Sequence, residues 1–135
     1  MKRAVLSILT GIALMNAFAS TGCGAHKVHG SMLHIDQTFN QREIAVAKLD
    51  TFELSLPENP TTGYRWEFRS NGEPVCRLVS TEFDASLGGI GSGGNRRWRF
   101  QVAETGVATI KLVYQRAFET DKPPAKSFEV TVHSK

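Results

Sequence analysis

The sequence predicts an all-β domain, an antiparallel sandwich of about seven or eight short strands. Three observations support this fold class. Apolar and polar residues alternate in many short stretches, turn residues separate these stretches, and no 3.6-residue apolar period continues past an interrupting glycine or proline. Because the pattern lacks the crossover helices that a parallel sheet needs, we expect the strands to pair antiparallel.

Each predicted strand has one apolar face and one polar face, as a half-buried strand requires. Two weaker candidates contain Ile44 with Val46 and the stretch 75–83. Glu104-Thr105-Gly106 predicts a tight hairpin between two of the clearest strands. These clear strands cover residues 52–56, 64–68, 98–102, 108–114 and 128–132.

Length and charge limit the function classes. The 135 residues suffice for one core of average size and leave no room for a second domain. The formal charge of +3 includes Lys2 and Arg3, which lie in a segment that we expect to be removed. Without them, 14 basic residues face 13 acidic ones. The mature chain therefore has no basic excess for nucleic-acid binding.

Residues 1–22 have the pattern of a signal peptide, in which Lys2 and Arg3 precede an apolar stretch too short to span a bilayer. Its end has two alternatives. Residues 17–19, Ala-Phe-Ala, fit a small-residue cleavage site, whereas residues 20–23, Ser-Thr-Gly-Cys, resemble the lipobox of bacterial lipoproteins. The second alternative, which we favour, makes Cys23 a lipidated membrane anchor. Either way, we expect an exported protein: a cell-envelope lipoprotein, or a periplasmic or secreted domain.

Residues 23–35 then predict a linker or tether with room for one short strand, and residues 36–135 form the predicted domain. The choice of cleavage site decides the state of the two cysteines, Cys23 and Cys76. Lipidation leaves Cys76 unpaired, whereas cleavage after Ala19 would permit a disulfide between the two. We expect Cys76 to be buried as a small hydrophobic residue.

The connection 57–64 is predicted to be stiff. Pro60 fixes its own φ and keeps Asn59 out of helical geometry, while Gly63 can take the positive φ of a turn. Between them, Thr61 and Thr62 present β-branched side chains with little rotamer freedom to lose. The alternative is a plain turn with solvated threonines.

Two further connections stand out. Five glycines occur within residues 88–94, and residues 89–94 satisfy G-x-G-x-x-G. A dinucleotide site needs a helix after that motif, but residues 96–102 alternate like a strand, so we expect no cofactor. The connection 114–127 carries Arg116 and Phe118, residue types that anchor protein interfaces. The alternatives are a surface loop without function and a Phe118 that packs beneath its own loop.

Together these connections resemble those of the chagasin-type inhibitors of papain-like cysteine proteases. That family has an Asn-Pro-Thr-Thr-Gly loop with an aromatic residue, a glycine-rich loop before a Trp-containing strand, and an Arg-Pro-Trp loop, in this order. The first motif matches completely and the second well, while Ala117 and Phe118 replace Pro and Trp in the third. The matching residues are Asn59, Pro60, Thr61, Thr62, Gly63, Tyr64, Gly91, Ser92, Gly93, Gly94, Arg116 and Phe118, with Trp98 in the following strand.

The resemblance implies an immunoglobulin-like sandwich that reversibly inhibits a papain-like cysteine protease, with the three loops in its active-site cleft. Thr61 and Thr62 would lie over the catalytic cysteine and histidine, the glycine loop along the non-primed side, and Arg116 and Phe118 on the primed side. It implies no catalysis, and we expect neither a cofactor nor a metal. We expect a monomer whose partner is the protease.

The sequence leaves three other functions to consider. An enzyme is disfavoured because three of the four histidines precede the domain and Cys76 has no identifiable catalytic partner. A metal site would have to use Cys23, His26, His29 and His34, in a segment expected to be a flexible tether. The main alternative is a non-inhibitory exported sandwich domain with a structural or adhesive role, which would not need the Asn-Pro-Thr-Thr-Gly loop.

Overall fold

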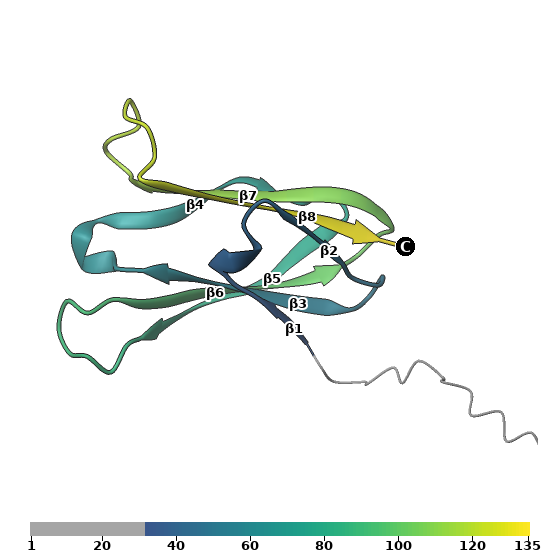
Figure 1. The fold of residues 1–135 in the computed structure, drawn as a ribbon, viewed down its shortest axis with the longest axis horizontal. Helices are drawn as coiled ribbons and strands as arrows, with labels where there is room; N and C mark the ends of the chain where they lie inside the picture. Colours follow the sequence, from purple (N-terminus) through teal and green to yellow (C-terminus); the bar gives the residue numbers. More distant parts are fainter. Residues whose placement is uncertain (1–31) are drawn as a thin grey trace, which may run out of the picture.

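The computed structural model describes residues 32–135 as a sandwich of two four-stranded sheets (Figure 1). The predicted all-β, immunoglobulin-like fold is confirmed. The predicted signal peptide, Cys23 and the tether up to residue 31 lie outside the described residues. The strands are β1 Leu33–Ile35, β2 Arg42–Ala45, β3 Thr51–Glu58, β4 Tyr64–Asn71, β5 Cys76–Ala85, β6 Gly94–Val102, β7 Gly106–Arg116 and β8 Lys126–Ser134.

One sheet has the order β1-β3-β6-β5 and the other β2-β8-β7-β4. The long strands pair antiparallel as predicted, but the short strands β1 and β2 run parallel to β3 and β8. Ile35 of β1 is only 2% exposed and belongs to the core. The folded domain therefore includes residues 33–35, which lie before the predicted domain boundary at residue 36 and within the predicted tether.

The predicted hairpin at Glu104-Thr105-Gly106 is wrong. Residues 103–105 join β6 to β7, but these strands lie in different sheets, so this short turn carries the chain across the sandwich. Alternation along a strand shows which residues point inward, but both sheets share the same core and give the same pattern. The sequence pattern therefore could not assign β6 and β7 to separate sheets.

The core consists of the inward side chains of both sheets. Phe52 and Phe100 stack with ring centroids 5.2 Å apart, and the Phe68 ring meets Phe100 edge-on at 6.1 Å. Cys76 is fully buried, as predicted, and burial raises the pKa of its thiol to about 11. The thiol is therefore protonated at neutral pH and is not a nucleophile there.

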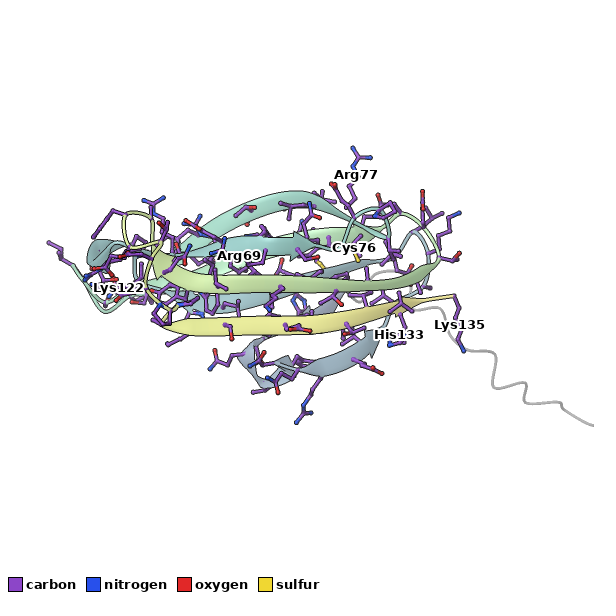
Figure 2. All side chains as sticks on the ribbon, turned by 90° about the horizontal axis from the view of Figure 1, so that it is seen from above. Arg69, Cys76, Arg77, Lys122, His133 and Lys135 are labelled. Atoms are coloured by element: carbon purple, nitrogen blue, oxygen red, sulfur yellow. The ribbon has the colours of Figure 1, made fainter. Side chains whose placement is uncertain are left out.

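Three connections lie together at one end of the sandwich (Figure 1): β3–β4, β5–β6 and β7–β8. The carboxyl terminus is at the opposite end, and Figure 2 shows Lys122 at the loop end with His133 and Lys135 at the other. β1 runs parallel to β3, which leads toward the loops, so the described chain also starts away from them. Within residues 32–135, no helix has the length and apolar character to cross a membrane.

Candidate functional site

Residues 59–63, which we call the threonine turn, connect β3 to β4 across the two sheets. Pro60–Thr62 form one turn of 3-10 helix, and Gly63 ends it with a φ of +81°. The Asn59 carbonyl accepts hydrogen bonds from the Thr62 amide at 3.2 Å and the Thr62 hydroxyl at 2.7 Å. The Gly63 amide donates to the Pro60 carbonyl at 3.1 Å. Thr61 and Thr62 remain exposed on this closed backbone.

Asn59 connects the threonine turn to the glycine loop, which we define as residues 86–93 between β5 and β6. Its side-chain oxygen accepts from the Thr61 amide at 3.2 Å and caps the turn. Its Nδ2 donates to the Gly91 carbonyl at 2.9 Å. Both ends of the side-chain amide are thus used inside the protein. Asn59 therefore acts as a link between two loops more than as a free contact residue.

Strand β7 holds the turn from the other side. The phenolic oxygen of Tyr114 accepts a hydrogen bond from the Asn59 amide at 3.0 Å. The Arg116 Nε donates to the Thr62 carbonyl at 3.1 Å, and its guanidinium lies 4.6 Å from the centroid of the Tyr64 ring. Arg116 therefore already has partners in the threonine turn and on β4.

The base of the turn contains a buried ion pair. Glu58 is 4% exposed, and one of its carboxylate oxygens accepts from the Arg96 Nη2 at 2.7 Å and Nε at 3.2 Å. Its other oxygen accepts from the Trp66 amide at 3.3 Å. These bonds join β3, β4 and β6 immediately below the loops and give the buried charge its partners.

The glycine loop is ordered by its own serines. The hydroxyls of Ser86 and Ser92 are 2.7 Å apart, and the Ser92 hydroxyl also donates to the Gly89 carbonyl at 2.6 Å. The Ser86 amide donates to the Gly93 carbonyl at 2.8 Å and closes the loop. Ser92, a predicted site residue, therefore shapes the loop from within.

The four predicted glycine-loop residues have different surroundings. A Cβ at Gly93 would lie 3.0 Å from the Glu58 carbonyl oxygen, and one at Gly94 would collide with the Asp84 carbonyl. Gly91 has a φ of +83° but faces open space. Gly93 and Gly94 therefore allow close backbone approach, whereas Gly91 supplies only a turn conformation.

The third loop, residues 117–125 between β7 and β8, exposes Phe118. The alternative in which Phe118 packs beneath its own loop is wrong, because the side chain is 76% exposed. Arg116 lies below it, with its guanidinium 5.9 Å from the ring centroid. Glu119 holds this base through Arg116 at 3.6 Å and Lys122 at 3.2 Å.

Leu87 and Ile90 are functional candidates that are not among the predicted site residues. They lie in the glycine loop and are 106% and 107% exposed, more than any other large hydrophobic residue described. A fully exposed aliphatic pair on a loop that is ordered by hydrogen bonds is typical of a binding surface. The available signal was two aliphatic residues placed among glycines, outside any alternating strand.

The metal alternative finds no support within residues 32–135, where no three histidine, cysteine or acidic side chains are grouped as ligands. His34 contacts Glu53, with 3.4 Å between Nδ1 and Oε1. The other candidate ligands, Cys23, His26 and His29, lie outside the described residues.

A known protein family matches most of the described domain. The family described as chagasin family peptidase inhibitor I42 matches residues 45–132, from β2 to β8. The chain belongs to this family. As a chagasin-family protein it is an inhibitor of papain-like cysteine proteases, and the function predicted from the three motifs is confirmed. The family consists of inhibitors rather than enzymes.

Individual relatives support the assignment. Chagasin of Trypanosoma cruzi is 26% identical over 101 residues, which cover 71% of this chain and 92% of chagasin. Amoebiasin-1 of Entamoeba histolytica is 37% identical over 78 residues, which cover 57% of this chain and 76% of the relative. The crystal structure of the cysteine protease inhibitor EhICP2 from Entamoeba histolytica superposes with a TM-score of 0.67 at 23% identity, covering 79% of this chain and 98% of that one. The last likeness concerns the fold.

Proposed function

We propose that this chagasin-family inhibitor inserts its loop end into the active-site cleft of a papain-like cysteine protease. The threonine turn covers the catalytic cysteine and histidine, the glycine loop lies along the non-primed side, and Phe118 contacts the primed side. The observation that supports this arrangement is the bonding between loops. Asn59 ties the turn to the glycine loop and Arg116 ties it to the base of the third loop, so one rigid surface carries all three.

The turn is poorly suited to be a substrate. Cleavage requires a carbonyl carbon in near-attack geometry, with its oxygen in the oxyanion hole. In the turn, the carbonyl oxygens of Asn59, Pro60 and Thr62 already accept hydrogen bonds within the protein. To be cleaved, the segment would have to give up these bonds and leave its helical turn. The loop end therefore acts as a plug with no chemistry of its own.

Rigidity also favours affinity. A flexible loop would lose conformational freedom on binding, whereas the bonds of Asn59 and Arg116 have ordered this end in advance. All three loops come from one chain, so a monomer presents the complete surface. We propose that the protein acts as a monomer and uses neither metal nor cofactor.

We propose further that the protein is exported and held at the cell envelope by a lipidated Cys23. The geometry supports this location, because β1 starts at the end of the sandwich away from the loops. A tether attached there leaves the loop end free for a protease in solution. Intact-mass measurement of the native protein tests the assignment: a mass with acyl chains on Cys23 supports it, and an unmodified chain beginning at Ser20 contradicts it.

The central experiment is a titration of papain with the purified domain, as the wild type and as Thr61→Ala with Thr62→Ala. The wild type should inhibit stoichiometrically or tightly, and the double variant more weakly while its melting temperature falls little. Thr105→Ala is the matched control, since Thr105 is an exposed turn threonine at the opposite end. Full papain activity at excess wild type would refute the proposed function. Equal inhibition by all three proteins would refute the role of the threonines.

A further inference from the structure

Two side chains of β7 hold the two ends of the threonine turn. Tyr114 and Arg116 are two residues apart on the strand and so lie on the same face. The Tyr114 hydroxyl contacts the Asn59 amide where the turn begins, and the Arg116 guanidinium contacts the Thr62 carbonyl near its end. The distances are 3.0 Å and 3.1 Å. One rigid strand thus fixes both ends of the turn.

We propose that Tyr114 and Arg116 are positioning residues that clamp the threonine turn and so make the protein an inhibitor rather than a substrate. This inference rests on the proposed function and deepens it. It assigns resistance to cleavage to two side chains below the turn, not to the threonines that face the protease.

The Tyr114 hydroxyl is held in place by its surroundings. Tyr114 is 9% exposed, and its ring lies against two aromatic rings of β4, with centroid distances of 5.4 Å to Tyr64 and 4.9 Å to Trp66. The Lys126 ammonium lies over the ring at 5.7 Å. A ring packed on these sides cannot swing away, so its hydroxyl is a fixed acceptor for the Asn59 amide.

The planar shape of the Arg116 guanidinium suits it to hold the Thr62 end of the threonine turn. Its planar guanidinium stacks on Tyr64 at 4.6 Å while its Nε donates to Thr62, and its Nη1 lies 3.6 Å from a Glu119 carboxylate oxygen. A lysine ammonium keeps the charge but cannot stack and donate with this fork geometry. Arg116→Lys therefore removes the clamp contact without removing the charge.

Without the clamp, the turn can open toward the extended backbone that a protease cleaves. The two variants that test this change few atoms: Tyr114→Phe removes one oxygen, and Arg116→Lys replaces the fork. Each of these hydrogen bonds contributes about 1 kcal/mol or more, so each variant should inhibit papain at least about 5-fold more weakly. On long incubation, papain should cut each variant between residues 59 and 63, as intact mass will show, while the wild type stays whole.

Val132→Ala is the matched control, because it destabilises the domain without touching the clamp. Val132 is fully buried on β8, where it pairs with Ala108 and Ile44 toward the end opposite the loops. If the clamp protects the turn, this variant melts at a lower temperature but is not cut within residues 59–63. Cleavage of Val132→Ala at the same rate as the clamp variants would overturn the proposal, since general stability would then explain the effect. Uncut, fully inhibitory clamp variants would overturn it as well.

A measurement on the free protein separates failure of the clamp from failure of the proposed function. Amide hydrogen exchange at Thr62 and Gly63 reports opening of the turn without any protease. Exchange should be about 5-fold faster in Tyr114→Phe and Arg116→Lys and nearly unchanged in Val132→Ala. If papain is not inhibited by the wild type but exchange follows this pattern, the clamp is real and the target is wrong. Unchanged exchange in the clamp variants overturns the clamp itself.

Discussion

The threonine turn and the glycine loop are bonded to each other, but they are held in different ways. The turn receives hydrogen bonds from side chains that belong to other elements, Tyr114 and Arg116 of β7. The glycine loop beyond its Gly91 contact with Asn59 is ordered by its own serines and exposes Leu87 and Ile90 completely. Side chains of the sandwich therefore hold the threonine turn in place, whereas hydrogen bonds within the glycine loop mainly order that loop.

This difference assigns the two regions different tasks. A segment placed over the catalytic residues of a protease must not relax into a substrate, so bracing from the core is an advantage there. A segment that fits side chains into neighbouring pockets gains affinity from the exposed apolar area that it buries there. We infer that resistance to cleavage resides in the turn and that much of the binding free energy comes from the glycine loop.

The largest expected effect comes from the exposed aliphatic pair. Replacing Leu87 and Ile90 by Ser should weaken inhibition of papain by more than about 100-fold, because burying each side chain in an apolar pocket contributes about 1.5–3 kcal/mol. The melting temperature should not change, since both side chains are fully exposed in the free protein. Val107→Thr, an exposed aliphatic position at the opposite end, should leave inhibition intact. Undiminished inhibition by the double variant would contradict this division of tasks.

A pair of glycine substitutions sharpens the comparison within one loop. Gly93→Ala combines a φ of +73° with a Cβ 3.0 Å from the Glu58 carbonyl oxygen, so we expect a loss of about 2–3 kcal/mol in unfolding free energy. Gly91→Ala has a similar φ but open space around it and should lose about 1 kcal/mol. Denaturant unfolding of both variants measures the difference. Equal losses would show that the packing of Gly93 against the turn is unimportant.

The buried Cys76 thiol, at the end of the sandwich opposite the loops, should make the stability of the whole domain depend on pH. Cys76 begins β5 at that end, and its buried thiol has a pKa of about 11 against 9.0 in the unfolded chain. Because the folded pKa is raised, this stability is complete below about pH 9 and is lost as the pH rises through 11. The thiol should therefore destabilise the wild type by about 1 kcal/mol at about pH 10. Cys76→Ala should lose less stability between neutral pH and about pH 10 in unfolding experiments, and an identical pH dependence would exclude the thiol as the cause.

The smallest expected effect is a gain. Replacing Ala117-Phe118 by Pro-Trp should restrict the third loop and enlarge its aromatic contact, tightening inhibition by about 2- to 5-fold. The inhibition constant against several papain-like proteases is the measurement. No change with any of them would show that the third loop contributes little beyond the Arg116 contact at its base.

Local sequence patterns predicted the strands of this fold but not how the strands are arranged in the two sheets. Phe52, Leu54 and Leu56 alternate with polar residues because one face of β3 is buried, and that burial is confirmed. The turn at residues 104–105 shows the limit, since a short connection can close a hairpin or cross between sheets. Which of these occurs depends on partners far away in the sequence.

In the candidate site too, the sequence predicted the local structure but not the contacts between distant residues. The Asn-Pro-Thr-Thr-Gly motif predicted a stiff turn because the backbone preferences of proline and glycine act over a few residues, and Pro60–Thr62 do form one. The Asn59 side chain caps it in the structure. Tyr114 gave no such signal. It alternates like any core residue of β7, and only packing brings its hydroxyl to an amide 55 positions away.

By itself, the sequence determined an alternating β chain with three unusual connections and a motif set that identifies a family of protease inhibitors. Only the tertiary structure decided that Arg116 reaches back to the Thr62 carbonyl, that Leu87 and Ile90 are the most exposed large apolar side chains described, and that the loops share an end away from the start of β1. The physical reason is the distance along the sequence over which each kind of interaction acts. Backbone preferences and turn chemistry act between neighbours, whereas the bonds that hold the loop end join residues more than thirty positions apart.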